Sequence, residues 1–361
     1  MDEQERLRIA LVSTPFVSTP PRGYGGTELV VAELARALAI DGVDVVVYAT
    51  GDSELSAPKG ATGSVEVRSL FSEAQWPPAD DVDHTHAAWC LRDIARDPIG
   101  FDAVHLHSVG AVDLARLCPY PLLYTIHHDH DPRLSAIYAR TPQLKTIGIS
   151  CNQSSRETPA PHGVVYHGLD PARYPAMPDQ GYLLFLGRYA RVKGCVQAIE
   201  TAERAGLPLV MAGQPHDVEY YENEVKPLIA RHGVMELGPV SGARKVGLVA
   251  RARALLFPIQ WEEPFGLVMI EAMLSGVPVL ATNRGSVSEI VDDGVTGVVC
   301  DDPAEMVAAA RISEKFFDRA RIRAIAQERW SAARMARDYL RLYRELIAAR
   351  VTGLDSSAAG A

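Results

Sequence analysis

The stretch Trp261-Glu262-Glu263-Pro264-Phe265-Gly266-Leu267-Val268-Met269-Ile270-Glu271-Ala272 carries the strongest indication of the fold. The apolar run Ala254–Pro258 precedes it and predicts a buried parallel strand. A Pro-Phe-Gly turn follows, and an apolar helical segment starts at Gly266. The turn therefore lies at the carboxyl end of a strand and opens a helix, which is where open α/β sheets bind ligands.

This turn has the chemistry of an anion site. The first N–H groups of a helix have no partner within the helix, and the helix dipole places positive charge at the same end. A phosphate group is stabilised in such a place. Glu271, inside the helix, can accept hydrogen bonds from a vicinal diol. A phosphate and a diol together predict a nucleotide sugar as the ligand.

Composition narrows the class of protein. A chain of 361 residues with 47% hydrophobic residues can fill two domain cores of roughly 150 residues each. The net charge of −9 argues against a nucleic-acid partner, which requires a basic surface. Five scattered cysteines predict reduced thiols in a cytoplasmic protein. The charged start Met1–Arg6 is not typical of a signal peptide, and no apolar run suggests stable membrane insertion.

Apolar runs alternate with helical patterns, which predicts parallel sheets with helices on both faces. A first series begins with a strand at Ile9–Ser13 and a helix at about Thr27–Ile40, and a second begins at Tyr182–Gly187. About the last 35 residues before Val351 are predicted to be helical, with an apolar stripe of Trp330, Met335, Tyr339, Leu342, Tyr343 and Leu346. Further strands are predicted at 45–49, 103–107, 122–127, 146–150, 164–167, 208–212, 234–237, 254–257, 277–281 and 297–300.

The block Pro258–Gly297 resembles the family-4 retaining glycosyltransferases of the GT-B architecture, because its segments Met273–Thr282, Gly285–Ile290 and Asp293–Gly297 match that family in order and spacing. The resemblance implies an α/β protein of two Rossmann-like, doubly wound parallel-sheet domains facing a cleft, with a C-terminal crossover helix. The domains implied are an acceptor-side domain at 1–168, a nucleotide-sugar-binding domain at 169–335, a terminal helix at 336–350 that packs back on the first domain, and a disordered tail at 351–361.

Two cations suit a diphosphate. Arg188 and Lys193 lie five residues apart in a loop that follows a strand, and they offer a planar fork and a compact charge. The loop is not a P-loop, because the required Gly-Lys-[Ser/Thr] ending is absent. The resemblance implies that both residues hold the donor phosphates. A solvated basic loop is the alternative.

Further donor contacts come from the resemblance. Gly25 and Gly26 look like the family's paired-glycine loop, although a turn without a ligand would use the same residues. The third glycine of a dinucleotide fingerprint is replaced by Glu28, which disfavours a nicotinamide enzyme. The resemblance further implies donor contacts from the side chains of Glu263 and Glu271, from the amides of Phe265, Gly266 and Leu267, and from Gly213 and Val240 near the base.

Histidines gather after two predicted strands. His105 and His107 end one strand, and the run His127–Asp131 ends another, so the two groups could form a zinc or manganese centre. The resemblance instead places His127 near the donor sugar or the acceptor, where it can hydrogen-bond or stabilise charge. His167 stands where the family usually has Asn, and its role is open.

These features predict a metal-independent, retaining glycosyltransferase that transfers a hexose from a nucleoside-diphosphate sugar, with UDP or GDP as the nucleotide and no cofactor. His127, Arg188, Lys193 and Glu263 are its predicted catalytic residues. Two alternatives remain: a metal-dependent hydrolase built on the two histidine groups, and a sugar-nucleotide-binding protein without activity. The sequence identifies neither the acceptor, which could be a small molecule, a saccharide or a lipid-linked group, nor the oligomeric state.

Overall fold

The computed structural model describes residues 6–358, with the backbone alone for 351–358. These residues form two compact units. Unit 1 comprises the described residues of the ranges 1–149, 154–168 and 332–361, and unit 2 comprises residues 150–153 and 169–331. The α/β class with two parallel sheets is confirmed.

Unit 1 is built on a seven-stranded sheet within its described residues, in the order β3-β2-β1-β4-β5-β6-β7. Every neighbouring pair of strands is parallel. The strands are β1 (Arg8–Val12), β2 (Asp44–Tyr48), β3 (Val65–Arg68), β4 (Ala103–Leu106), β5 (Leu122–Thr125), β6 (Leu144–Gly148) and β7 (Gly163–Val164).

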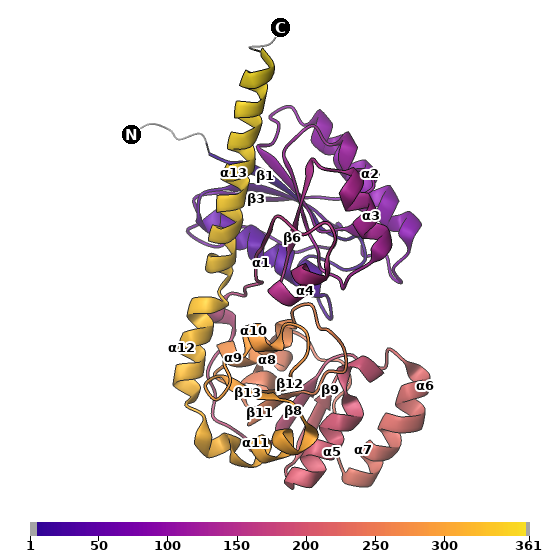
Figure 1. Cartoon of the computed structure of the whole chain (residues 1–361), viewed down its shortest axis with the longest axis vertical. Helices are drawn as coiled ribbons and strands as arrows, with labels where there is room; N and C mark the ends of the chain where they lie inside the picture. The colour runs from indigo at the N-terminus through magenta and orange to yellow at the C-terminus, as the bar shows by residue number, and fades with distance from the viewer. Residues whose placement is uncertain (1–5, 359–361) are drawn as a thin grey trace. The chain divides into compact units, whose positions relative to one another are not determined.

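Helices cover both faces of this sheet (Figure 1). On one face lie α1 (Gly26–Ile40) and α13 (Ala332–Ala358), which contact each other, and on the other lie α2 (Asp80–Arg96) and α3 (Pro132–Arg140). Side chains alternate between the faces along each strand. Val104 and Tyr124 therefore join the core under α2 and α3, whereas His105 and Thr125 point to the face of α13.

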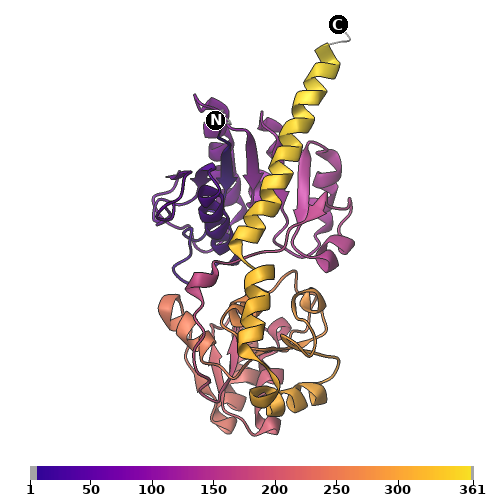
Figure 2. The same cartoon turned by 90° about the vertical axis from the view of Figure 1, so that its left-hand side faces the viewer.

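The last helix differs from the predicted one in its ends. It begins at Ala332 rather than at 336, and it continues to Ala358 through most of the predicted tail 351–361, of which 359–361 lie outside the described residues. Adding a residue to an existing helix costs far less than starting a new one, so weak helix formers can extend it. In Figure 2, α13 runs along unit 1 in yellow, and it contacts α1 and β4.

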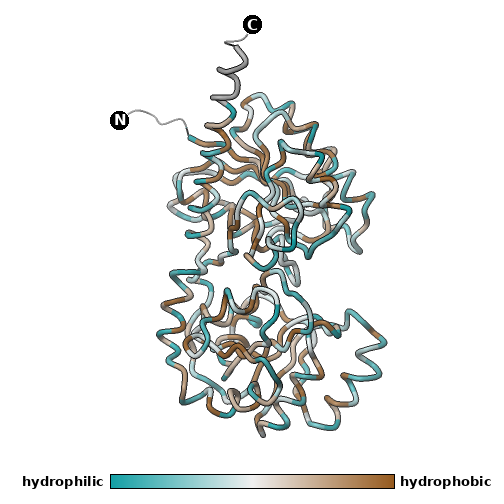
Figure 3. Tube along the Cα trace, viewed as in Figure 1, coloured by the Kyte–Doolittle hydropathy of each residue, from teal (hydrophilic) through white to brown (hydrophobic). Residues whose placement is uncertain are grey.

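Unit 2 contains a six-stranded parallel sheet among the residues described, in the order β10-β9-β8-β11-β12-β13. Figure 3 shows hydrophobic residues concentrated in the strands of each unit. The unit 2 strands are β8 (Leu183–Leu186), β9 (Leu209–Ala212), β10 (Met235–Glu236), β11 (Ala254–Phe257), β12 (Val279–Thr282) and β13 (Gly297–Cys300).

Helices also flank the second sheet, with α5 packed on α11 and α9 packed on α12 and α8. Several begin with an aspartate side chain that accepts backbone N–H bonds: Asp302 caps α11 and Asp318 caps α12. The helices are α5 (Cys195–Ala205), α6 (Val218–Tyr220), α7 (Lys226–His232), α8 (Gly242–Ala250), α9 (Leu267–Leu274), α10 (Val287–Ile290), α11 (Pro303–Phe316) and α12 (Arg319–Arg329), and the short α4 (Cys151–Arg156) lies where the chain changes units.

Candidate active site

The predicted donor residues of unit 2 all follow the carboxyl ends of its strands. Because the strands are parallel, these ends lie along one edge of the sheet, where ligands bind in this class of fold. The loop after β8 holds Arg188 and Lys193, Gly213 follows β9, Val240 follows β10, Glu263 follows β11, and Glu271 lies on α9.

Lys193 and Glu263 meet in a shielded ion pair. The ammonium nitrogen of Lys193 lies 2.5 Å from Oε2 of Glu263, and their side chains are 13% and 11% exposed. The indole N–H of Trp261 donates to the same oxygen at 2.8 Å. The ammonium also lies 4.9 Å from the centre of the Trp261 ring, a favourable cation–π position. The sequence assigns Lys193 and Glu263 to different parts of the donor, but in the structure they form an ion pair with each other.

Two glycines permit this meeting. Gly194 has a φ of +75°, and a Cβ atom on it would lie 1.9 Å from the carbonyl oxygen of Pro258. The loop after β8 can therefore touch the segment after β11, which brings Lys193 to Glu263. Gly285 has a φ of +59°, and its Cβ would lie 2.3 Å from the backbone nitrogen of Glu263. Only glycine allows both approaches.

Arg188 has different surroundings from Lys193. It is half-buried, and one of its terminal nitrogens lies 3.4 Å from Nε2 of His216. Arg191, between the two predicted phosphate ligands, is exposed and pairs with Glu224 at 2.5 Å. The same short loop therefore holds one shielded cation, one half-buried cation and one surface cation.

Glu271 is bonded to a residue that the sequence analysis did not single out. Its carboxylate is 2% exposed and lies 2.6 Å from the ammonium of Lys245 on α8. The hydroxyl of Tyr174 donates to the same oxygen, Oε1, at 3.3 Å. Oε2 receives no hydrogen bond from the residues that the structure describes, so it is available to a ligand hydroxyl.

The amino end of α9 lacks a side-chain cap, as an anion site at a helix end would. Its N-cap, Gly266, has a left-handed φ of +84°, and no side chain caps the helix. A Cβ on Gly266 would also lie 2.7 Å from Cε of Met269 and 3.1 Å from the ring of Phe257, although the left-handed φ is the stronger reason for glycine here. Phe265 is buried, and its carbonyl accepts the Ser286 hydroxyl at 2.7 Å. The amides of Phe265, Gly266 and Leu267 are thus held on a fixed turn.

Close packing also accounts for the presence of glycine at some positions that the sequence analysis assigned to ligand binding. A Cβ on Gly213 would lie 1.8 Å from the carbonyl oxygen of Gly187, so this glycine lets the loops after β8 and β9 touch. In unit 1, a Cβ on Gly25 would lie 2.8 Å from a carboxyl oxygen of Glu28. Gly26 is the first residue of α1. The donor contacts predicted for Gly25, Gly26, Gly213 and Val240 stay predictions.

Four histidines of unit 1 form one connected group, called here the histidine column: His105, His107, His127 and His167. The rings of His105 and His107 are 4.0 Å apart, Nδ1 of His107 lies 2.8 Å from Nε2 of His127, and His127 stacks on His167 at 5.3 Å. Burial lowers the pKa of His105, His107 and His167 well below the usual range, and that of His127 to about 3. All four rings are therefore neutral at pH 7.

The helix α13 fixes one end of this column. The hydroxyl of Tyr343 lies 2.8 Å from Nδ1 of His105, and Thr125 Oγ1 lies 2.7 Å from Nε2 of the same ring. Tyr339 is bonded to Thr125 at 2.7 Å. Both ring nitrogens of His105 are occupied by hydroxyl groups.

The structure does not assemble the alternative metal centre. Among the residues it describes, no three His, Cys, Asp or Glu side chains are placed to hold a metal ion. Asp131 caps α3 through the backbone N–H of Arg133, and His130 lies 3.3 Å from Glu157. The side chains of the run His127–Asp131 thus have different partners. Of this run, it is His127 that contacts His107, the residue just after β4.

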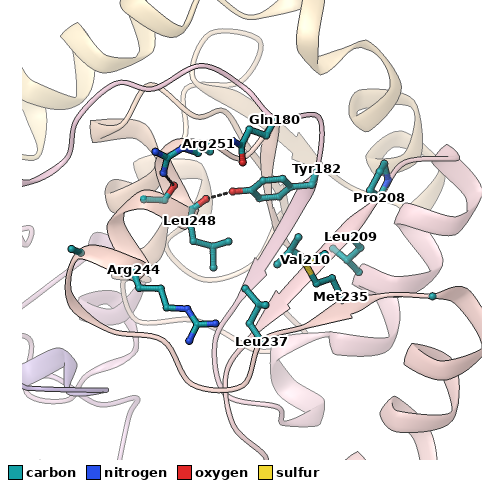
Figure 4. A pocket seen from close by; sticks show the side chains of 13 residues that line it. Gln180, Tyr182, Pro208, Leu209, Val210, Met235, Leu237, Arg244, Leu248 and Arg251 are labelled. Atoms are coloured by element: carbon teal, nitrogen blue, oxygen red, sulfur yellow. Dashed lines mark hydrogen bonds between the residues drawn. The ribbon is translucent and has the colours of Figure 1, made fainter.

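A pocket of about 620 Å³ lies elsewhere on unit 2 (Figure 4). It is bordered by α8 and by residues at the amino ends of β8, β9 and β10, such as Tyr182, Leu209 and Met235. The Tyr182 hydroxyl donates to the carbonyl of Leu248 across it at 2.6 Å. None of the predicted donor residues lines this pocket, which lies toward the opposite ends of the strands.

Comparisons with known proteins agree with this geometry. Residues 24–149 match the model of Glycosyltransferase Family 4, and residues 170–331 match that of Glycosyl transferases group 1. The glycogen synthase of Mycobacterium tuberculosis (strain ATCC 25618 / H37Rv) is 28% identical, with 84% of this chain and 85% of that protein covered. The D-inositol 3-phosphate glycosyltransferase of Arthrobacter sp. (strain FB24) is 26% identical, with 90% and 94% covered.

A solved structure adds the fold. AviGT4, a glycosyltransferase involved in avilamycin A biosynthesis, superposes with a TM-score of 0.73 at 28% identity, covering 95% of this chain and 98% of that one. Fold and matches together define a glycosyltransferase. The chain belongs to the family-4-like glycosyltransferases of the GT-B architecture. No helix in the described part of the chain is both long and apolar enough to cross a membrane.

The structure adds site residues that sequence reasoning missed. Lys245 and Tyr343 carry their polar groups to partners far away in the sequence, and no local motif marks them. His107 was considered only as a metal ligand, and its contact with His127 follows from the adjacency of β4 and β5. Trp261 was given no role in the sequence analysis, although an aromatic residue two positions from Glu263 is visible in the sequence.

Proposed function

We propose that this enzyme transfers a hexosyl group from a nucleoside-diphosphate sugar to a hydroxyl acceptor, with retention of configuration and without a metal ion. The observation that carries the proposal is the meeting of Lys193, Glu263 and Trp261 beside the uncapped amino end of α9. Positive charge, a carboxylate and a helix end without a side-chain cap at one sheet edge match a phosphorylated sugar.

Lys193 can serve the pyrophosphate without leaving Glu263. An ammonium has three N–H donors, of which one is directed to Oε2 of Glu263. The others can reach phosphate oxygens, and Arg188 adds a planar fork from the same loop. These cations neutralise the charge that develops on the leaving diphosphate, which is the part that a divalent metal plays in other transferases.

Glu263 and Glu271 would hold the two sugars of the donor. Lys193 and Trp261 both donate to Oε2 of Glu263, and Oε1 receives no hydrogen bond from any described residue. Oε1 can therefore accept a hydroxyl of the transferred sugar, while Oε2 of Glu271 accepts a ribose hydroxyl. The amides of Phe265, Gly266 and Leu267 complete the contacts to sugar and phosphate oxygens, and the leaving phosphate takes the proton of the acceptor hydroxyl.

We propose a reducing, cytoplasmic location, because the five cysteines are scattered and odd in number and do not follow a pattern of disulfide pairs. We propose UDP or GDP as the nucleotide. We propose that the acceptor is the hydroxyl of a small molecule, a saccharide or a lipid-linked group.

The proposal is tested by removing each cation of the loop in turn. Lys193→Met and Arg188→Gln should each lower turnover at saturating donor by about 30- to 1,000-fold, since a lost contact to developing charge costs about 2–4 kcal/mol. Arg191→Gln is the matched control, because Arg191 lies in the same loop but pairs with Glu224 at the surface. It should keep turnover near that of the wild type.

The donor is identified in the same preparations by calorimetric titration with UDP- and GDP-sugars. If Lys193→Met and Arg191→Gln had the same turnover, the assignment of Lys193 to the diphosphate would be wrong. If no nucleotide sugar bound to the folded wild-type protein, the donor class itself would be wrong.

A further inference from the structure

Within the histidine column, the contact between His107 and His127 limits which ring nitrogens of these two residues can carry a proton. Nδ1 of His107 and Nε2 of His127 are 2.8 Å apart, so one nitrogen carries a proton and the other accepts it. Burial keeps both rings neutral at pH 7, and each therefore has a single N–H. The position of the shared proton consequently decides the tautomer of both residues.

The second nitrogen of His107 shows which arrangement is favoured. His107 is 2% exposed, and its Nε2 is buried without a hydrogen-bond partner among the described residues. If His127 donated the shared proton, the proton of His107 would lie on Nε2 as a buried donor with no acceptor. If His107 donates, Nε2 is a bare lone pair. Buried N–H groups without a partner are rarer in proteins than unsatisfied acceptors.

We propose that His107 is a positioning residue, which donates from Nδ1 to His127 and so holds His127 as the Nδ1–H tautomer. With Nε2 occupied, the nitrogen that His127 can offer to a ligand is Nδ1, and it carries a proton. His127 then meets a sugar or phosphate oxygen as a hydrogen-bond donor and not as a base. The part that concerns the ligand rests on the proposed function, whereas the tautomer is a property of the free enzyme.

The neighbours of His107 prevent its ring from turning over. The His105 ring lies 4.0 Å from it, and His105 is fixed through both nitrogens by Tyr343 and Thr125. On the other side of the contact, His167 stacks on His127 with an interplanar angle of 20°. The shared proton therefore lies between two rings whose orientations are fixed by packing, and the helix α13 contributes to that constraint through Tyr343.

The tautomer can be measured directly by NMR on the full chain with ¹⁵N-labelled histidine, since protonated and bare ring nitrogens have well-separated shifts. The His127 signals are assigned by comparison with His127→Gln. We expect Nε2 of His127 to be bare and Nδ1 to be protonated. A protonated Nε2 in the wild-type enzyme would overturn the proposal.

Two substitutions separate positioning from packing. His107→Asn keeps an N–H at the position of Nδ1, whereas His107→Leu removes it at similar bulk. His107→Asn should keep the wild-type tautomer and kcat/KM. In His107→Leu, part of His127 should shift to the Nε2–H form, and kcat/KM should fall about ten-fold, the effect of one lost hydrogen bond. Equal kcat/KM and equal tautomers in both variants would contradict the proposal.

The two proposals fail in different ways. If the donor were not a nucleotide sugar, the wild-type enzyme would turn over none, but the ring-nitrogen spectrum of the free protein would still show a bare Nε2 on His127. If only the positioning were wrong, transfer would proceed and the spectrum would show the opposite tautomer.

Discussion

Two of the lysine–glutamate ion pairs in unit 2 have nearly equal nitrogen–oxygen distances but differ in burial. Lys245 and Glu271 are 2.6 Å apart, with side chains 30% and 2% exposed. Lys226 and Glu222 are 2.7 Å apart, with side chains 55% and 49% exposed. Replacing each lysine by Met removes the ammonium and keeps most of the stem, so the comparison isolates the effect of burial on one ion pair.

The magnitudes follow from what each carboxylate retains. In Lys245→Met, Glu271 keeps the Tyr174 hydroxyl at 3.3 Å but loses its cation while shielded from water. Leaving a buried charge without its partner costs about 3–5 kcal/mol, and the partial exposure of Lys245 favours the lower value, about 3 kcal/mol. In Lys226→Met, water replaces the lost contact, and the expected cost is about 0.5 kcal/mol or less.

Urea unfolding followed by tryptophan fluorescence measures both costs, since Trp261 and Trp330 lie in unit 2. With slopes of about 1–3 kcal/mol per molar urea, Lys245→Met should lower the midpoint of the unit 2 transition by about 1–3 M at unchanged slope. The double variant Lys245→Met with Glu271→Gln should recover part of the loss, because no unpaired charge remains. Equal midpoints for Lys245→Met and Lys226→Met would refute the reasoning that burial sets the strength of this pair.

Two further predictions concern a glycine of unit 2 and the histidines of unit 1. Gly194→Ala should lower the stability of unit 2 by about 3 kcal/mol or more, because the new Cβ would clash with the Pro258 carbonyl. Gly206→Ala is the control: Gly206 has a similar φ of +72° but open space around it, so the substitution should cost about 1 kcal/mol. Equal melting temperatures of the two variants would contradict this prediction. The histidine column should make unit 1 sensitive to acid: each ring has a lower pKa when folded than the unfolded value of about 6.5, so the stability it contributes is complete above pH 6.5 and is lost as the pH falls toward the folded pKa, about 3 for His127. The free energy of unfolding obtained from urea titrations should fall by about 1.4 kcal/mol per pH unit for each such ring below about pH 6.5, and a flat profile from pH 7 to pH 4.5 would show that the rings are not buried as neutral groups.

Local sequence pattern was sufficient for most of the fold. The apolar runs that became β8, β11 and β12 are continuous because these strands are buried on both faces, and periodicity detects such strands well. The edge strand β3, Val65–Arg68, was not predicted, since it is half-exposed and alternates valine with charged residues over only four positions. The start of α13 was placed four residues late, because no capping motif marks Ala332.

Contacts between side chains that are far apart in the chain could not be predicted from the sequence. Lys193 and Glu263 were both singled out, but nothing local shows that Gly194 and Pro258 touch and bring them together. Tyr343 was predicted as part of an apolar stripe, which its buried ring fits. That its hydroxyl meets His105 depends on a contact across 238 positions of the chain.

The composition of unit 1 from both ends of the chain has a consequence for biosynthesis. During translation, the strands of its sheet leave the ribosome before residues 169–331 of unit 2, but α13 emerges after them. Until α13 is available, His105 lacks its hydrogen bond to the Tyr343 hydroxyl, and α1 covers its face of the sheet without α13 beside it. All of unit 2 is therefore synthesised before α13 can complete the packing on the sheet of unit 1.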